Sequence, residues 1–187
     1  KKDIPLQESF AAIDACKRVG ITPNVGFIVG FPNEDEQSAR ETFDAYERSL
    51  RVGCRPAHIF VLCPFAGSSL YGRLGELECD GHFVDLPLGS DADLANRQRV
   101  VANQDLHGAY FRPKLPDLFG GETGALTALD EFSPLVEATL MPTLELASRL
   151  GGMYEVFRTW LRWIRRINGE RGVAERRLGY GSPAVFA

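Results

Sequence analysis

Two glycines near a short apolar run are the residues whose type and spacing first suggest chemistry. The run Val25 to Val29 contains Gly26, and Gly30 follows it directly. Glycine weakens a strand interior, so it often marks a place where a ligand or another backbone approaches closely. Because side chains alternate along a strand, both glycines face the same side. The spacing predicts either bare main chain for a flat ligand or close helix–strand packing.

A helix start follows this run. Pro32 breaks the apolar pattern, and acids occupy positions 34–36. We expect Asn33 to cap the helix, with Glu36 completing a capping-box pair. A helix N-terminus offers unpaired N–H groups and a positive dipole to a ligand at the strand end. The same dipole is a sufficient reason for acids in a first turn, so we predict no metal site there.

A second apolar run, residues 56–65, ends in a similar way. Pro64 and Gly67 stop it sharply, which leaves its last backbone groups available. In parallel α/β proteins, ligands bind at the carboxyl ends of the strands. Leu62 and Cys63 would then lie beside the end of the first strand. An ordinary strand-to-helix loop is the alternative interpretation.

Helices and strands are expected to alternate over residues 6–74. Apolar residues recur at helical spacing in two segments, and Gly20 and Gly53 are placed to end these helices. The order helix, strand, helix, strand, helix predicts an α/β fold with a parallel sheet and right-handed crossovers. The recurring residues are Phe10, Ile13 and Cys16 in the first helix, and Ala39, Phe43, Tyr46 and Leu50 in the second.

The character of the sequence changes after Gly75. Residues 79–92 are predicted to be a loop or linker, and residues 93–187 a mainly helical C-terminal region. Ser133 and Pro134 are interpreted as N-cap and first residue of a helix that Pro142 kinks. Other helical positions are Leu94, Val101 and Leu106, and then Tyr154, Phe157, Leu161 and Ile164 in a helix that ends at Gly169.

Composition excludes several classes of protein. The 187 residues carry a net charge of −4, so no global basic field favours nucleic acid. No apolar run reaches the ~18 residues that a membrane helix needs. The four cysteines match no zinc or iron–sulfur spacing, and reduced thiols predict a cytoplasmic protein. The segment 151–187 has seven Arg and three Glu, which indicates a solvated helix or a contact face for an acidic partner.

Two motifs resemble one enzyme family. "AIDACKRVGITPNVGFIVGFPNE", and then "FVLCPFAGSSLYGRL" after the second helix, are similar to strands five and six of radical S-adenosylmethionine (radical SAM) enzymes. In that family, strand five reads G-F-I-V-G-F-P-G-E or similar, and strand six ends in a P-x-P-G-T-x-L-Y-like turn. This chain differs in having Asn33 for a common Gly, Phe65 and Ala66 near the second Pro, and Ser68 for Thr.

The resemblance implies that residues 1–78 form the last strands of a partial (βα)6 barrel. The segment Gly26 to Gly30, with Ile28 at its centre, would contact the adenine of S-adenosylmethionine. The end of the next strand, Leu62 to Pro64, would flank that adenine. The helical region would cap the open barrel and shape the access of a small-molecule or peptide substrate.

The resemblance also implies a [4Fe–4S] cluster held by a C-x-x-x-C-x-x-C loop. This spacing is absent from the sequence. We therefore expect the cluster ligands upstream of Lys1, in a missing N-terminal part of the same polypeptide. The sequences of these two strands, together with the helical extension, also resemble the family members that carry a cobalamin-binding domain. This resemblance implies cobalamin-dependent methylation, or modification of a peptide or natural product, as a further expectation.

Two other classes remain open. One is a non-catalytic α/β binding or assembly module that uses the Arg-rich helical face. The other is a different nucleotide-binding α/β enzyme with its site at the same strand ends. The glycine spacing G-x-x-x-G disfavours a Rossmann dehydrogenase, whose fingerprint is G-x-G-x-x-G.

Overall fold

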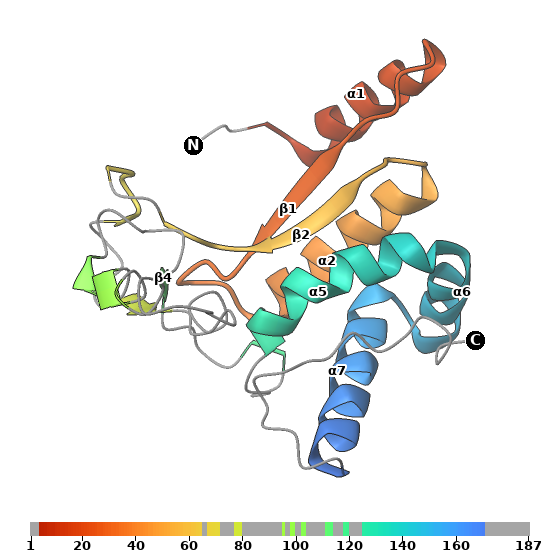
Figure 1. Cartoon of the computed structure of the whole chain (residues 1–187). Helices are drawn as coiled ribbons and strands as arrows, with labels where there is room; N and C mark the ends of the chain where they lie inside the picture. Colours follow the sequence, from red (N-terminus) through yellow and green to blue (C-terminus); the bar gives the residue numbers. More distant parts are fainter. Residues whose placement is uncertain are drawn as a thin grey trace.

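A computed structural model describes residues 4–64, 67–71, 77–79, 95, 98–99, 102–103, 111–113, 118–119 and 125–170. Within these residues the protein is a mixed α/β structure that is rich in helix (Figure 1). Its centre is a pair of parallel strands with helices packed on one face. None of the helices in this part of the chain combines the length and the apolar character needed to cross a membrane.

The first four elements are α1 (Leu6–Arg18), β1 (Val25–Val29), α2 (Glu36–Arg51) and β2 (Ala57–Val61). β1 and β2 pair in parallel, with Phe27 opposite Ile59, and α2 is the crossover helix between them. The order helix, strand, helix, strand is thus confirmed, and the two strands are neighbours as expected. The expected third helix is not confirmed, because residues 67–70 form turns and 72–74 lie outside the described residues. Gly20 and Gly53 both have positive φ and follow the ends of α1 and α2, as predicted.

The two strands have one buried and one open face. Side chains alternate along each strand, so every second residue points into the core. The core side of β1 and β2 consists of Val25, Phe27, Val29, Ala57, Ile59 and Val61. The crossover helix α2 packs against this side with a stripe that includes Ala39, Phe43, Tyr46 and Leu50, the residues that the helical spacing had singled out.

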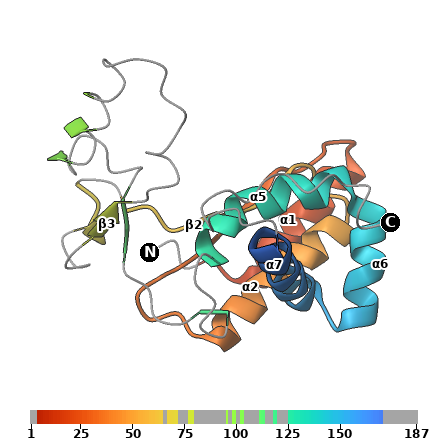
Figure 2. The same ribbon diagram turned by 60° about the horizontal axis from the view of Figure 1, so that its bottom comes forward.

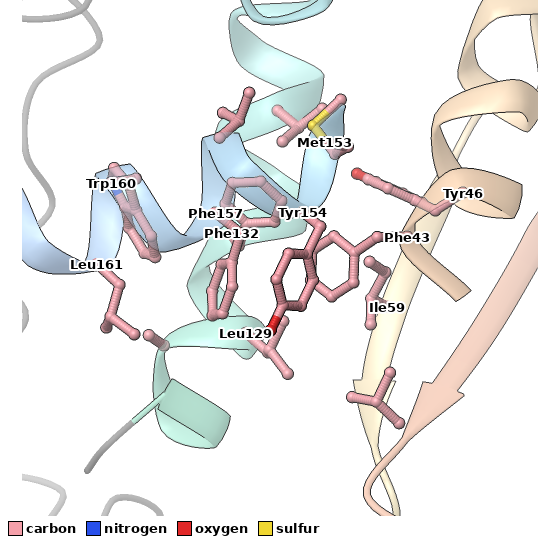
Figure 3. Close-up of a cluster of buried hydrophobic side chains, with 14 of the residues drawn as sticks. Phe43, Tyr46, Ile59, Leu129, Phe132, Met153, Tyr154, Phe157, Trp160 and Leu161 are labelled. Atoms are coloured by element: carbon pink, nitrogen blue, oxygen red, sulfur yellow. The ribbon is translucent and has the colours of Figure 1, made fainter. Parts of the chain in front are cut away.

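Three helices complete the core: α5 (Ala125–Ala138), α6 (Leu140–Leu150) and α7 (Met153–Glu170). α5 packs along β2, whereas α7 lies against α2 and α6 (Figure 2). Aromatic rings from several elements meet in the interior (Figure 3), and the rings of Phe43 and Phe157 have centroids 5.4 Å apart. The buried set includes Tyr154, Phe157, Leu161 and Ile164, as the sequence predicted for α7.

Two sequence-based helix starts are wrong. α2 begins at Glu36, and Asp35 rather than Asn33 is its cap. The Asp35 carboxylate accepts a hydrogen bond from the Ser38 N–H at 2.8 Å, and the Ser38 hydroxyl accepts one from the Asp35 N–H at 2.9 Å. This reciprocal pair, a capping box, provides acceptors for the N–H groups of Asp35 and Ser38. A helix that began at Asn33 would lack this capping box.

Ser133 and Pro134 lie inside α5 and do not start a helix. The Ser133 hydroxyl is used by β2, as described below, so it is not available for capping. The predicted kink at Pro142 is instead a break between two helices, because α5 ends at Ala138 and α6 begins at Leu140. Pro142 thereby lies in the first turn of α6, where its missing N–H costs little.

β3 (Leu77–Cys79) and β4 (Phe111–Pro113) form a short antiparallel pair. The sequence analysis does not predict this pair. Its register sets Glu78 opposite Arg112. The predicted loop at 79–92 lies almost wholly outside the described residues, as do Leu94, Val101 and Leu106 of the predicted helix. The parallel sheet in the described part of the chain has two strands, β1 and β2.

Candidate functional site

Among the described residues, no helix packs on the side of the parallel pair that is formed by Gly26 and Ile28 of β1 and by His58 and Phe60 of β2, and we call this side the open face. Ile28 lies opposite Phe60 in the register of the pair. Their side chains are 47% and 48% exposed, although both are large and apolar. Parallel sheets are normally covered on both faces, so an aliphatic and an aromatic side chain exposed side by side form a candidate binding surface.

Gly26 provides room for an aromatic ring of the same protein. A Cβ placed on Gly26 would lie 3.2 Å from Cε2 of Phe60, closer than an ordinary van der Waals contact. The Phe60 ring in turn lies 5.6 Å from the His58 ring, centroid to centroid. The main chain at Gly26 is therefore partly covered by Phe60, and the Phe60 ring presents the aromatic surface at this point.

Gly30 has a different role at the end of β1. Its φ of 98° lies in the region that side-chain-bearing residues rarely adopt. The chain turns there, and the Glu34 carboxylate reaches back to accept hydrogen bonds from the N–H groups of Gly30 and Phe31, the latter at 3.1 Å. Glu34 therefore occupies the donors that an anion would use, so this strand end suits a neutral or cationic ligand group.

The predicted site residues after β2 lie beside the end of β1. The Leu62 N–H donates to the Val29 carbonyl at 2.7 Å, which extends the pairing one step beyond β2. Leu62 and Pro64 are buried, and Cys63 is half-buried. The structure thus brings Gly26, Ile28, Gly30, Leu62, Cys63 and Pro64 to two adjacent strands, and the last four to their carboxyl ends.

The outer edge of β2 is closed by side chains of α5. The Ile59 N–H donates to the Ser133 hydroxyl at 2.9 Å, and the Ala57 N–H donates to the Glu137 carboxylate at 3.1 Å. Sequence reasoning missed both residues. Their signal is two polar side chains four residues apart, a spacing that places them on one helix face.

In the part of the chain that the structure describes, the cysteines are not gathered as the ligands of an iron–sulfur cluster would be. Cys54 is buried, whereas Cys16 and Cys63 are half-buried on other segments. In the same residues, no three His, Cys, Asp or Glu side chains gather closely enough to hold a metal ion. The open face does suit a flat heteroaromatic ring, because Ile28 offers an apolar contact and Phe60 an aromatic one.

A charged network joins α2 to the Arg-rich helix α7. The Arg40 guanidinium pairs with the Glu155 carboxylate at 2.7 Å and with Glu36 at 2.9 Å. The hydrogen bond from Arg40 holds the pKa of Glu36 below its ordinary value. Arg158 approaches Glu36 at 3.6 Å, so this arginine of α7 binds within the molecule.

Comparisons of the chain with models of protein families, with curated proteins and with solved structures find no match.

Proposed function

We propose that this chain is the S-adenosylmethionine-binding C-terminal portion of a radical SAM enzyme. The observation that carries the proposal is the open face. Two adjacent parallel strands expose Ile28 and Phe60 next to the carboxyl ends where α/β enzymes bind their ligands. The motifs "GFIVGFPNE" and "LCPFAGSSLYGRL" lie at these two strand ends, in the order that the family resemblance requires.

In this proposal the adenine lies flat on the open face. Ile28 contributes apolar contact, and the Phe60 ring contributes stacking to the purine. The Glu34 carboxylate lies at the end of β1, where its negative charge favours the cationic sulfonium end of the ligand. Gly30 holds the turn that brings Glu34 into this position.

The [4Fe–4S] cluster of such an enzyme needs ligands from outside the described residues. We place them in polypeptide that precedes α1 in the same protein, as the family resemblance implies. The role of the present residues is to bind and orient the adenosyl group. A small-molecule or peptide substrate would approach from the side on which the strands end.

Substitution of Ile28 tests the binding surface. We expect Ile28→Gln to weaken the binding of S-adenosylmethionine to the full natural polypeptide about tenfold, because a polar amide replaces an apolar contact worth on the order of 1.4 kcal/mol. Isothermal titration calorimetry measures the dissociation constant. Met141→Gln is the matched control, since Met141 is also large, apolar and 72% exposed, but lies on α6.

Two outcomes of the titration would contradict the proposed function. The first is that the unsubstituted polypeptide binds no S-adenosylmethionine. The second is that Ile28→Gln and Met141→Gln bind it equally well, because the ligand would then lie away from the open face.

A further inference from the structure

Among the residues that form the open face, His58 is the one with a polar side chain. Gly26 has no side chain, and Ile28 and Phe60 are apolar. His58 lies on β2 directly opposite Gly26 in the register of the pair, and it is half-buried. An imidazole is therefore placed within a surface that otherwise offers only apolar and aromatic contact.

The His58 imidazole has hydrogen-bonding capacity that the protein does not use. It makes no hydrogen bond and no ion pair with any residue that the structure describes. Its aromatic contact is with the Phe60 ring, whose centroid lies 5.6 Å away at an interplanar angle of 44°. A neutral imidazole has one N–H donor and one acceptor nitrogen, so both remain for a ligand on this face.

The Phe60 ring and the imidazole lie at the same level of the sheet. A Cβ placed on Gly26 would lie 3.2 Å from Cε2 of Phe60, so the Phe60 ring leans towards Gly26. Gly26 is the residue opposite His58. A flat ring stacked on Phe60 therefore has one of its edges beside His58, because a purine extends beyond the outline of a phenyl ring.

The proposed orientation of the cofactor determines which purine edge this is. The sulfonium end is directed towards the Glu34 carboxylate at the carboxyl end of β1, and the ribose attached to N9 of adenine leads there. His58 precedes Phe60 by two residues, so it lies on the amino-terminal side, away from Glu34. The adenine edge opposite N9, which carries N1 and the 6-amino group, therefore points towards His58.

We propose that His58 is a specificity-determining residue of the open face, whose imidazole hydrogen-bonds with the edge of adenine that carries N1 and the 6-amino group. The inference rests on the proposed function, because it requires adenine on the open face with its ribose towards Glu34. Ile28 and Phe60 hold a flat ring by apolar contact and stacking, whereas His58 favours a ring with a polar edge. A few placed polar groups within an apolar site commonly provide such selection.

Two substitutions of nearly equal size test this hydrogen bond. In the full natural polypeptide, His58→Met removes the hydrogen-bonding groups, whereas His58→Gln keeps a donor and an acceptor. We expect His58→Met to weaken the binding of S-adenosylmethionine about fivefold, and His58→Gln to bind within about twofold of the unsubstituted polypeptide. Isothermal titration calorimetry measures the three dissociation constants. Both variants lose the imidazole ring, so the comparison between them isolates the hydrogen bond.

The orientation of the adenine can be measured without any substitution. In adenine, the H2 proton lies next to N1, whereas the H8 proton lies next to N9. Nuclear Overhauser spectra of the unsubstituted polypeptide with S-adenosylmethionine should therefore connect H2, and not H8, to the ring protons of His58.

Two results would overturn this inference while leaving the proposed function in place. One is equal affinity of His58→Met and His58→Gln when Ile28→Gln weakens binding, because the ligand then occupies the open face without a bond to His58. The other is a contact from H8 to His58 in place of H2, which reverses the adenine. If the unsubstituted polypeptide binds no S-adenosylmethionine, or if Ile28→Gln binds it as well as Met141→Gln does, both proposals are wrong.

Discussion

At the scale of single residues, Gly26 and Gly30 have different physical reasons for being glycine. Gly26 leaves space for the Phe60 ring, whereas Gly30 adopts a φ of 98° at the turn after β1. The sequence correctly predicts that both lie at the same pair of strands. It does not predict Phe60 over Gly26, because a contact across strands depends on a register that spacing alone does not define.

The same substitution should therefore have unequal effects at the two positions. Gly30→Ala should lower the free energy of unfolding by about 1–3 kcal/mol, because alanine is strained at positive φ. Gly26→Ala should cost less than about 1 kcal/mol, since a half-exposed Phe60 ring can move by a few tenths of an ångström. Urea unfolding measures both values, and an equal or reversed order would contradict the assignment of φ at Gly30.

Ser133 provides a second prediction at this scale. Ser133→Ala should lower the free energy of unfolding by about 1–3 kcal/mol, because it leaves the buried Ile59 N–H without its acceptor. Ser9→Ala on the exposed surface of α1 is the matched control and should change it by no more than about 0.5 kcal/mol. Equal effects of the two substitutions would show that Ser133 does not close the edge of β2.

At the scale of elements, apolar periodicity predicts the helices better than it predicts their ends. The stripe of α2 and the buried residues of α7 follow from spacing of three and four. The ends depend on which polar side chain reaches which backbone group. Asn33, Asp35 and Ser133 are all good capping residues in isolation, and only the tertiary structure decides that Asp35 caps α2 and Ser133 serves β2.

The junction of α2 and α7 predicts a pH dependence. The pKa of Glu36 is lowered in the folded state, mainly by the hydrogen bond from Arg40, so ionised Glu36 stabilises the fold. This contribution is complete above the ordinary value of 4.5 and is lost as the pH falls through the lowered value. Glu36→Gln should therefore be less stable than the unsubstituted protein at neutral pH, with a gap that closes in acid.

Thermal unfolding at a series of pH values measures this gap. The Arg40→Met background serves as the control, because it removes the main cause of the lowered pKa of Glu36 and should reduce the pH-dependent part of the difference. A gap that stays constant from neutral to acid pH would contradict the role of Glu36.

At the scale of the whole molecule, the sequence predicts a mixed α/β fold in which β1 and β2 lie side by side, and the structure confirms both points. It does not predict α5 as the closing element of the sheet, because Ser133 and Glu137 lie more than seventy residues from β2 in the chain. The position of such a contact is set by packing between distant segments, which local patterns do not contain. The sequence predicts that the candidate site residues lie at two neighbouring strand ends, but it does not predict that Phe60 covers Gly26 or that Glu34 binds the Gly30 N–H.

Direct observation of the adenine on the open face is the sharpest test of the proposed function. Nuclear Overhauser spectra of the full natural polypeptide with S-adenosylmethionine should connect the adenine ring protons to the Ile28 methyl groups and the Phe60 ring. Contacts confined to other residues, such as those of α7, or the absence of any bound ligand, would contradict the account.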